Sequence, residues 1–236
     1  MGIEGLFENP KPTRLISALS KISSGKEDLI LDFFAGSGTT AHAVLDLNKQ
    51  DGGNRKFILV QLPEPTDRTD YPTISEITKE RVRRVIKKLN DEDGNEKNQD
   101  RGFRVFKLAE SNFTPWDGSI DQSPEALSRQ VEMHIEHVRQ GRTDQDILYE
   151  ILLKSGFPLS IPVETLQVDG KTVYSISDGI MLVCLDRNLS MPSVQAIVDR
   201  LPERVVFLDE GFAGNDALKV NAKEACKLKN IVFKVV

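Results

Sequence analysis

The chain has 236 residues and a net charge of −5, with 39% hydrophobic and 28% charged residues, a composition ordinary for a soluble globular protein. This length allows one large or two modest domains with ample core. No apolar run reaches the roughly eighteen residues of a membrane span, and no basic-then-apolar leader follows Met1, which argues against secretion. Cys184 and Cys226 are isolated, so we expect two reduced, buried thiols in a cytoplasmic protein.

The first part of the chain predicts a βαβ unit. Pro12 suits the first turn of a helix. A buried parallel strand is then expected at 29–34, a helix at 39–49 and a second strand at 57–62. The crossover between such strands is expected to be right-handed.

A glycine loop separates the first strand from its helix. Gly36 and Gly38 allow backbone to approach a ligand where a Cβ would collide, and the helix N-terminus presents unpaired N–H groups. The spacing Gly36-x-Gly38-x-x-Ala41 also fits the wider dinucleotide fingerprint. The bare pattern therefore leaves the ligand open.

A long helix is expected to follow, opened by a capping box at Thr73 and Glu76. It carries a basic stripe of Lys79, Arg81, Arg83, Arg84, Lys87 and Lys88. The stripe suits either a DNA-facing edge or the solvated side of an amphipathic helix, and we favour the solvated side.

The middle of the chain is polar from 90 to 101 and predicts a loop, followed by a strand at 102–108. A helix is expected from Ser123 to about residue 138, and Thr143 is expected to cap the next helix. His134 and His137 stand three residues apart on the first of these helices. A metal pair is conceivable, but no third ligand has a recognisable spacing, so we favour ordinary surface or core positions.

The C-terminal third predicts a β-meander, because Asp169-Gly170 and Asp178-Gly179 punctuate three β-rich runs. The elements expected after it are a helix at 193–200, a strand at 205–208, a helix at 216–227 and a strand at 231–235. Asp209 and Glu210 follow a strand, where carboxylates can bind metal. No Lys or His arrangement accompanies them, so we do not favour a nuclease site.

Three motifs together carry a family resemblance. The run from Asp32 through Phe34, Gly36 and Gly38 to Thr40 resembles the cofactor loop of amino-type DNA methyltransferases that use S-adenosylmethionine. Upstream, 7–12 is similar to the Lys-Pro element that precedes this loop in the β-class order, and 57–64 occupies the place of the second cofactor strand. In this order the motifs resemble the modification subunit of type III restriction–modification systems.

The resemblance implies an α/β fold class: a Rossmann-like, S-adenosylmethionine-dependent methyltransferase half, followed by a smaller α/β domain with a β-meander. We expect a cofactor-binding part over 1–110, a helical connecting segment over 111–156 and a C-terminal α/β domain over 157–236.

The resemblance also implies a cofactor site. The expected cofactor-binding residues are Lys11, Pro12, Asp32, Phe34, Gly36, Ser37, Gly38, Thr39 and Gln61. Asp32 would face the ammonium group of the methyl donor, and the N–H groups of 36–39 with the hydroxyls of Ser37 and Thr39 would bind its carboxylate. Lys11 would add a cation. Gln61 departs from the acidic residue that usually accepts the ribose hydroxyls, so we expect weaker ribose binding.

The target-base motif of these enzymes, Asp/Asn/Ser-Pro-Pro-Tyr/Phe/Trp, is missing, because the chain has no Pro-Pro dipeptide. We therefore expect a C-terminal fragment of an adenine-N6 DNA methyltransferase subunit, inactive alone, with cytosine N4 left open as the methylated atom. The implied partners are DNA through the intact parent protein, a restriction subunit and a second copy. The alternatives are an NAD-dependent Rossmann oxidoreductase and a non-catalytic assembly module.

Overall fold

The computed structural model describes residues 7, 9–94, 99–114, 123, 138–212 and 214–236. The chain divides into two compact units, 1–105 and 106–236. Most of the helix predicted from Ser123 to residue 138 lies outside the described residues, as do His134 and His137.

The N-terminal unit is built around two parallel strands. Its elements are α1 (Thr13–Ser23), β1 (Leu29–Asp32), α2 (Thr39–Asp51), β2 (Lys56–Leu59) and α3 (Ile74–Asp93). Leu29 pairs with Lys56 and Asp32 with Leu59, so the strands run in parallel along their whole length. The predicted order of elements is confirmed, and both strands end two or three residues earlier than expected.

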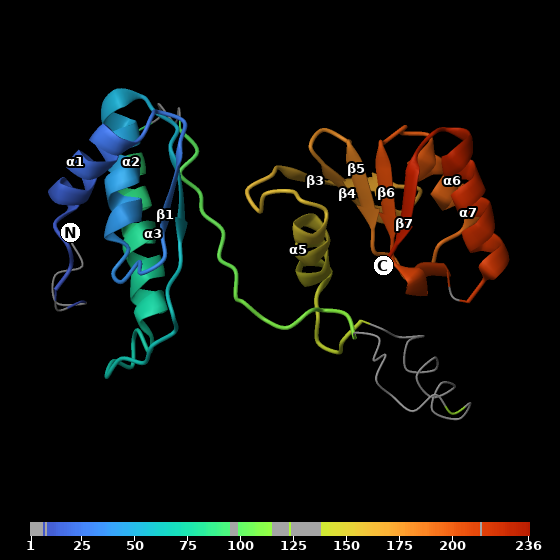
Figure 1. The fold of residues 1–236 in the computed structure, drawn as a ribbon, viewed down its shortest axis with the longest axis horizontal. Coiled ribbons are helices and arrows are strands. Elements are labelled where there is room, and N and C mark those ends of the chain that lie inside the picture. Colours follow the sequence, from blue (N-terminus) through green and yellow to red (C-terminus); the bar gives the residue numbers. More distant parts are fainter. Residues whose placement is uncertain (1–6, 8, 95–98, 115–122, 124–137, 213) are drawn as a thin grey trace. The chain divides into compact units, whose positions relative to one another are not determined.

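The helices of this unit pack on one face of the strand pair (Figure 1). Ala41 and Leu45 of α2 bury themselves against Val82 and Val85 of α3. The opposite face is uncovered: its apolar side chains include Leu29, Leu31, Ile58, Val60 and Leu62, and all are exposed. The prediction of a buried first strand is therefore wrong for this face, because the described helices cover only the other one.

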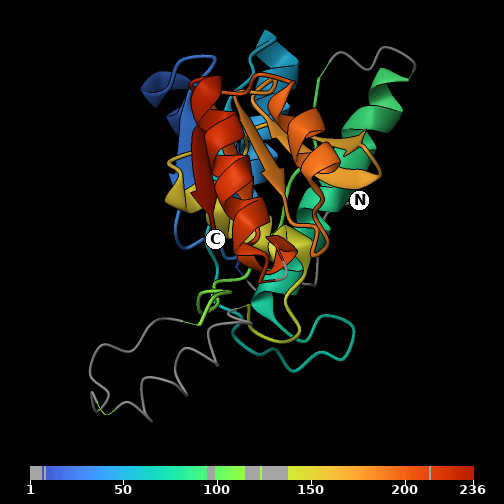
Figure 2. The ribbon, with the colours of Figure 1, turned by 90° about the vertical axis from the view of Figure 1, so that its right-hand side faces the viewer.

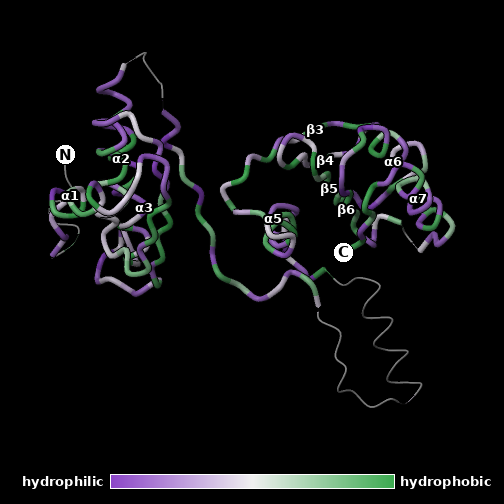
Figure 3. Tube along the Cα trace, turned by 45° about the horizontal axis from the view of Figure 1, so that its top comes forward, coloured by the Kyte–Doolittle hydropathy of each residue, from purple (hydrophilic) through white to green (hydrophobic). Residues whose placement is uncertain are grey.

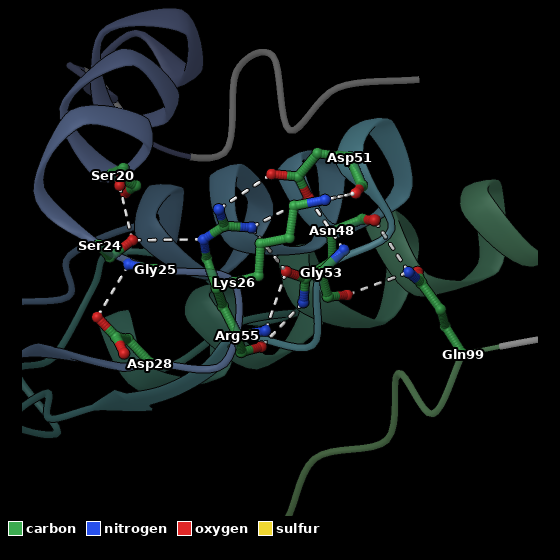
Figure 4. A network of polar contacts seen from close by, with 10 residues as sticks. All are labelled: Ser20, Ser24, Gly25, Lys26, Asp28, Asn48, Asp51, Gly53, Arg55 and Gln99. Carbon is green, nitrogen blue, oxygen red and sulfur yellow. Dashed lines mark hydrogen bonds and ion pairs between the residues drawn. The ribbon is translucent and has the colours of Figure 1, made fainter.

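A polar network closes the βαβ unit where α2 ends and β2 begins (Figure 4). Arg55, 6% exposed, donates through both Nη atoms to the Asp51 carboxylate, at 3.1 and 3.0 Å. The Asn48 side chain accepts from the Arg55 backbone N–H and donates to its carbonyl. Lys26, just before β1, donates to the Asp51 carbonyl oxygen at 2.6 Å. These contacts fix the N-terminal ends of β1 and β2 relative to the C-terminal end of α2.

The C-terminal unit has a five-stranded mixed sheet in the order β3-β4-β5-β6-β7. Its elements are α5 (Asp144–Lys154), β3 (Val163–Val168), β4 (Lys171–Ile176), β5 (Met181–Cys184), α6 (Met191–Val198), β6 (Arg204–Phe207), a 3₁₀ turn (Asp209–Phe212), α7 (Asp216–Leu228) and β7 (Val232–Val235). The β3–β4 and β4–β5 pairs are antiparallel, and the β5–β6 and β6–β7 pairs are parallel.

The two Asp-Gly pairs lie in the turns between the first three strands. Asp169 and Gly170 have φ of 49° and 72°, the left-handed pair that a two-residue primed hairpin turn requires. The second connection is wider than predicted. It spans 177–180, and the Ile180 N–H donates to the Ser177 carbonyl oxygen at 3.2 Å.

Helices cover both faces of this sheet. Val194 and Ile197 of α6 and Cys226 of α7 share one apolar core with Leu182 and Phe207 of the sheet. Figure 2 views the unit from the side of α6 and α7. In Figure 3, β5 and β6 are largely hydrophobic, as expected for strands buried on both faces.

Helix α5 packs on the other face of the sheet. Leu148 and Leu152 share a core with Met181 and Val206. The predicted cap is present, because the Thr143 hydroxyl accepts from the Asp146 N–H and the Asp146 carboxylate accepts from the Thr143 N–H. The segment expected to be a connection thus contributes a helix to the C-terminal core.

The strand predicted at 102–108 is absent from the structure. Phe103 packs against the core of the N-terminal unit, whereas the Phe106 ring meets the Tyr149 ring of α5 at a centroid distance of 4.8 Å. The two rings therefore contact different units, and the alternating pattern does not mark a strand. None of the helices in the described part of the chain has both the length and the apolarity to span a membrane.

Candidate functional site

The glycine loop follows β1 and is held by main-chain contacts from β2. The Ala35 N–H donates to the Val60 carbonyl oxygen at 3.1 Å, and the Val60 N–H donates to that of Asp32 at 2.8 Å. Gly36 and Gly38 have φ of 51° and 78°, in the left-handed region that favours glycine. These contacts bring the loop over the N-terminus of α2.

Packing against α3 is a second reason for glycine at position 38. A Cβ there would lie 3.1 Å from Thr78 Cγ2 and 3.3 Å from the Thr78 carbonyl oxygen. The Thr78 hydroxyl in turn donates to the Gly36 carbonyl oxygen at 2.5 Å. The loop is thus fixed to α3 without a ligand.

Asp32 ends β1 with its carboxylate beside the loop. One carboxylate oxygen accepts from the Phe34 N–H at 3.0 Å, and the other accepts from the Thr40 hydroxyl at 2.5 Å. No cationic side chain in the described part of the chain forms an ion pair with Asp32. The negative charge is therefore positioned by neutral donors and available to an external cation.

Gln61 lies at the loop and uses its amide oxygen there. That oxygen accepts from the Gly36 N–H at 2.7 Å, while the amide nitrogen donates to the Leu62 carbonyl oxygen. The Gly38 N–H also has an internal acceptor, the Ala35 carbonyl oxygen, at 2.8 Å. Two of the N–H groups expected to bind a ligand carboxylate are thus occupied. The N–H groups of Ser37 and Thr39 have no acceptor among the described residues.

Arg81 is the main residue of this site that the sequence did not reveal. It was predicted on the solvated side of α3, but it is 7% exposed. One guanidinium nitrogen, Nη1, donates to the hydroxyls of Ser37 and Thr39, both at 2.7 Å. Arg83, Lys87 and Lys88 are exposed, in line with the favoured interpretation of the stripe.

The remaining predicted site residues border the loop. Lys11 is exposed, and its carbonyl oxygen accepts from the Thr39 hydroxyl at 3.3 Å. Pro12 is the N-cap residue of α1. Phe34 is 86% exposed, and its ring meets that of Phe33 edge to face at 5.7 Å.

The other candidate sites are occupied by ion pairs. Lys219 lies 2.5 Å from the Asp209 carboxylate, and Arg187 lies 2.8 Å from that of Glu210. Across the residues that the structure describes, no three His, Cys, Asp or Glu side chains gather as a metal site would require. The glycine loop is therefore the candidate site that the structure brings together best.

The sequence is similar to those of known proteins. The family described as DNA methylase (N6_N4_Mtase) matches residues 2–106. The type III restriction–modification enzyme EcoPI Mod subunit of Escherichia phage P1 is 32% identical over 96% of this chain and 37% of its own length. The EcoP15I Mod subunit of Escherichia coli is 31% identical over 91% of this chain and 33% of its own length. The StyLTI Mod subunit of Salmonella typhimurium is 40% identical over half of this chain.

The chain is therefore similar to type III modification subunits over most of its own length. The DNA methylase match coincides with the N-terminal unit and so contains the whole glycine loop. Similarity to the two longest-matched Mod subunits extends through the C-terminal unit as well. The chain spans only about a third of the length of these Mod subunits.

Proposed function

We propose that this chain supplies the S-adenosylmethionine-binding part and the C-terminal domain of a site-specific DNA methyltransferase subunit that modifies adenine at N6. The proposal rests on two features of the glycine loop: a carboxylate that could bind a cation, and N–H groups that could bind an anion. Among the residues that the structure describes, Asp32 offers a carboxylate without a cationic partner, and Ser37 and Thr39 offer N–H groups without an acceptor.

This arrangement suits the amino-acid end of the methyl donor. Its ammonium group would bind to Asp32, and its carboxylate would bind at the N-terminus of α2, where N–H donors and the helix dipole favour an anion. Phe34, exposed beside the loop, would pack against the ligand.

The uncovered face of the β1–β2 pair supports a larger, Rossmann-like sheet in the parent protein. Parallel sheets normally have both faces covered, yet Leu31 and Ile58 are 53% and 46% exposed here. Because the related Mod subunits are about three times as long, we infer that further elements of the methyltransferase domain cover this face.

The chain's contribution to methyl transfer would be orientation. A bound donor would supply a sulfonium methyl group. The amino nitrogen of a flipped-out base would take this methyl as the S–C bond breaks, which leaves S-adenosylhomocysteine and releases a proton. Asp32 and the loop would hold the donor and so orient that methyl group. The Pro-Pro motif that grips the base is missing from the sequence, so we propose that this chain alone transfers no methyl groups.

The family also suggests the assembly. We propose that the parent subunit binds DNA, associates with a second copy and pairs with a restriction subunit. The related proteins are named as Mod subunits of type III restriction–modification enzymes.

Calorimetric titration with S-adenosylmethionine and with NAD tests the proposed cofactor. We expect binding of S-adenosylmethionine in preference to NAD, and Asp32→Ala should weaken it. Preference for NAD would support the oxidoreductase alternative, and binding of neither would reject the cofactor assignment. In a separate assay with radiolabelled donor and duplex DNA, sustained methyl transfer by this chain would contradict its proposed inactivity.

A further inference from the structure

Arg81 is a buried cation that reaches the glycine loop from α3. Its Nη1 donates to the hydroxyls of Ser37 and Thr39, and its Nη2 donates to the Thr13 hydroxyl at 3.2 Å and lies 3.4 Å from His42 Nδ1. Neither terminal nitrogen of the guanidinium meets a carboxylate in these contacts. The side chain joins α1, the loop and α2 at one point.

The other buried arginines show what is unusual about this one. Arg55 and Arg101, both 6% exposed, form ion pairs with Asp51 and Asp93. Arg81 forms no ion pair with any carboxylate among the described residues. Asp46 lies beyond His42, whose Nε2 it meets at 3.2 Å. Burial lowers the pKa of Arg81, opposed by the charge of Asp46. Buried charges are normally paired, so this position is suited to an external anion.

The hydroxyl hydrogens of Ser37 and Thr39 have a defined direction. Each hydroxyl accepts from Nη1 at 2.7 Å, so its own hydrogen must point away from the guanidinium. The Thr39 hydroxyl can donate to the Lys11 carbonyl oxygen, 3.3 Å away. The Ser37 hydroxyl has only a weak internal acceptor, Thr39 Oγ1 at 3.3 Å, and so can donate to a bound anion.

We propose that Arg81 is a positioning residue for the carboxylate of the methyl donor, acting through the Ser37 and Thr39 hydroxyls rather than by direct contact. This inference rests on the proposed function, because it assumes that the donor's amino-acid end lies at the loop. Arg81 would also make the site selective, because its buried positive charge favours a donor that carries a carboxylate over one that lacks it.

Two probes separate this role from a purely structural one. S-adenosylmethionine and its decarboxylated form share the ammonium and sulfonium groups and differ in the carboxylate. Arg81→Met should weaken binding of S-adenosylmethionine by about tenfold, because the ligand carboxylate loses the attraction of a nearby buried positive charge. Binding of the decarboxylated probe should change by less than about twofold, because a ligand without the carboxylate has no negative group for this charge to attract. Arg81→Lys should recover part of the preference, and Ser37→Ala should lose part of it.

Arg55→Met is the matched control, because Arg55 is equally buried but paired with Asp51. It should lower the thermal midpoint without changing the ratio of the two affinities. Equal losses for both probes in Arg81→Met would overturn the inference while leaving the proposed function intact. An unchanged ratio in Ser37→Ala, the milder variant, would overturn it as well. If the unmodified chain binds neither probe, the proposed function itself fails.

Discussion

Gln61 and Gly36 are joined by a hydrogen bond of 2.7 Å, from the Gly36 N–H to the Gln61 amide oxygen, across 25 positions of sequence. The bond connects the segment after β2 to the turn that follows β1. Gln61 stands where an acidic residue would be expected to bind ribose, and here its side chain shapes the loop. That Gln61 also contacts the ribose of the methyl donor stays a prediction.

Removing this contact should loosen the loop. In Gln61→Ala the Gly36 N–H loses its acceptor, so we expect its hydrogen exchange to accelerate by roughly five- to tenfold, the equivalent of about 1 kcal/mol. Gln61→Glu keeps an acceptor oxygen and should retain protection. Amide exchange followed by NMR gives the comparison, and unchanged protection in Gln61→Ala would mean that the main-chain contacts suffice.

Gly38 is expected to tolerate a side chain poorly. Gly38→Ala combines a left-handed φ of 78° with close contacts to Thr78, so unfolding of the N-terminal unit should become easier by about 2–3 kcal/mol. Gly52→Ala is the control, since its φ of 68° is similar but nothing lies within 4 Å of the added Cβ. It should cost only about 1 kcal/mol. Equal costs in urea unfolding would show that packing against α3 is unimportant.

Helix α5 supplies a paired test of the C-terminal core. Leu152 is fully buried and Leu153 is 58% exposed, on the same turn of the helix. Leu152→Ala should destabilise the C-terminal unit by about 2–5 kcal/mol, and Leu153→Ala by less than about 0.5 kcal/mol. Chemical denaturation measures both. Similar losses in the two variants would contradict the packing of α5 on this sheet.

The two thiols predict a decline of stability at alkaline pH. Burial raises the pKa of Cys184 and of Cys226 from 9.0 to about 11. The folded chain therefore keeps these protons between pH 9 and 11, whereas the unfolded chain releases them. Stability attributable to each thiol is fully present below pH 9. It should fall by about 1.4 kcal/mol per pH unit above that.

Other groups titrate in the same range, so the thiol contribution is isolated by difference. The double variant Cys184→Ala/Cys226→Ala should show a shallower loss of stability between pH 9 and 11 than the unmodified chain. Parallel curves would mean that the thiols are accessible as thiolates in the folded state.

Local signals in the sequence predicted much of the fold. Thr143 and Asp146 form the expected helix cap, and Asp169-Gly170 forms the expected tight turn, because both depend on residues close in the chain. The strand predicted at 102–108 did not form because a strand needs a partner. Phe103 instead packs against the core of the N-terminal unit, and the Phe106 ring contacts the Tyr149 ring.

Arg81 shows how a site residue can be overlooked. The run of basic residues along α3 favoured a solvated position for Arg81. However, Arg81 lies four residues after Ile77 and four before Val85, and both of these residues are buried. On a helix that spacing means the same face. The position was therefore predictable as inward-facing. Its hydroxyl partners were not, because Ser37 and Thr39 come from a loop more than 40 residues away.

The most direct measurement is an NMR titration of the ¹⁵N-labelled chain with S-adenosylmethionine, which detects even weak binding residue by residue. We predict shift changes concentrated at 32–41 and at Arg81, and their loss in Asp32→Asn. Changes centred elsewhere, or an unaltered response in Asp32→Asn, would contradict the placement of the donor at this loop.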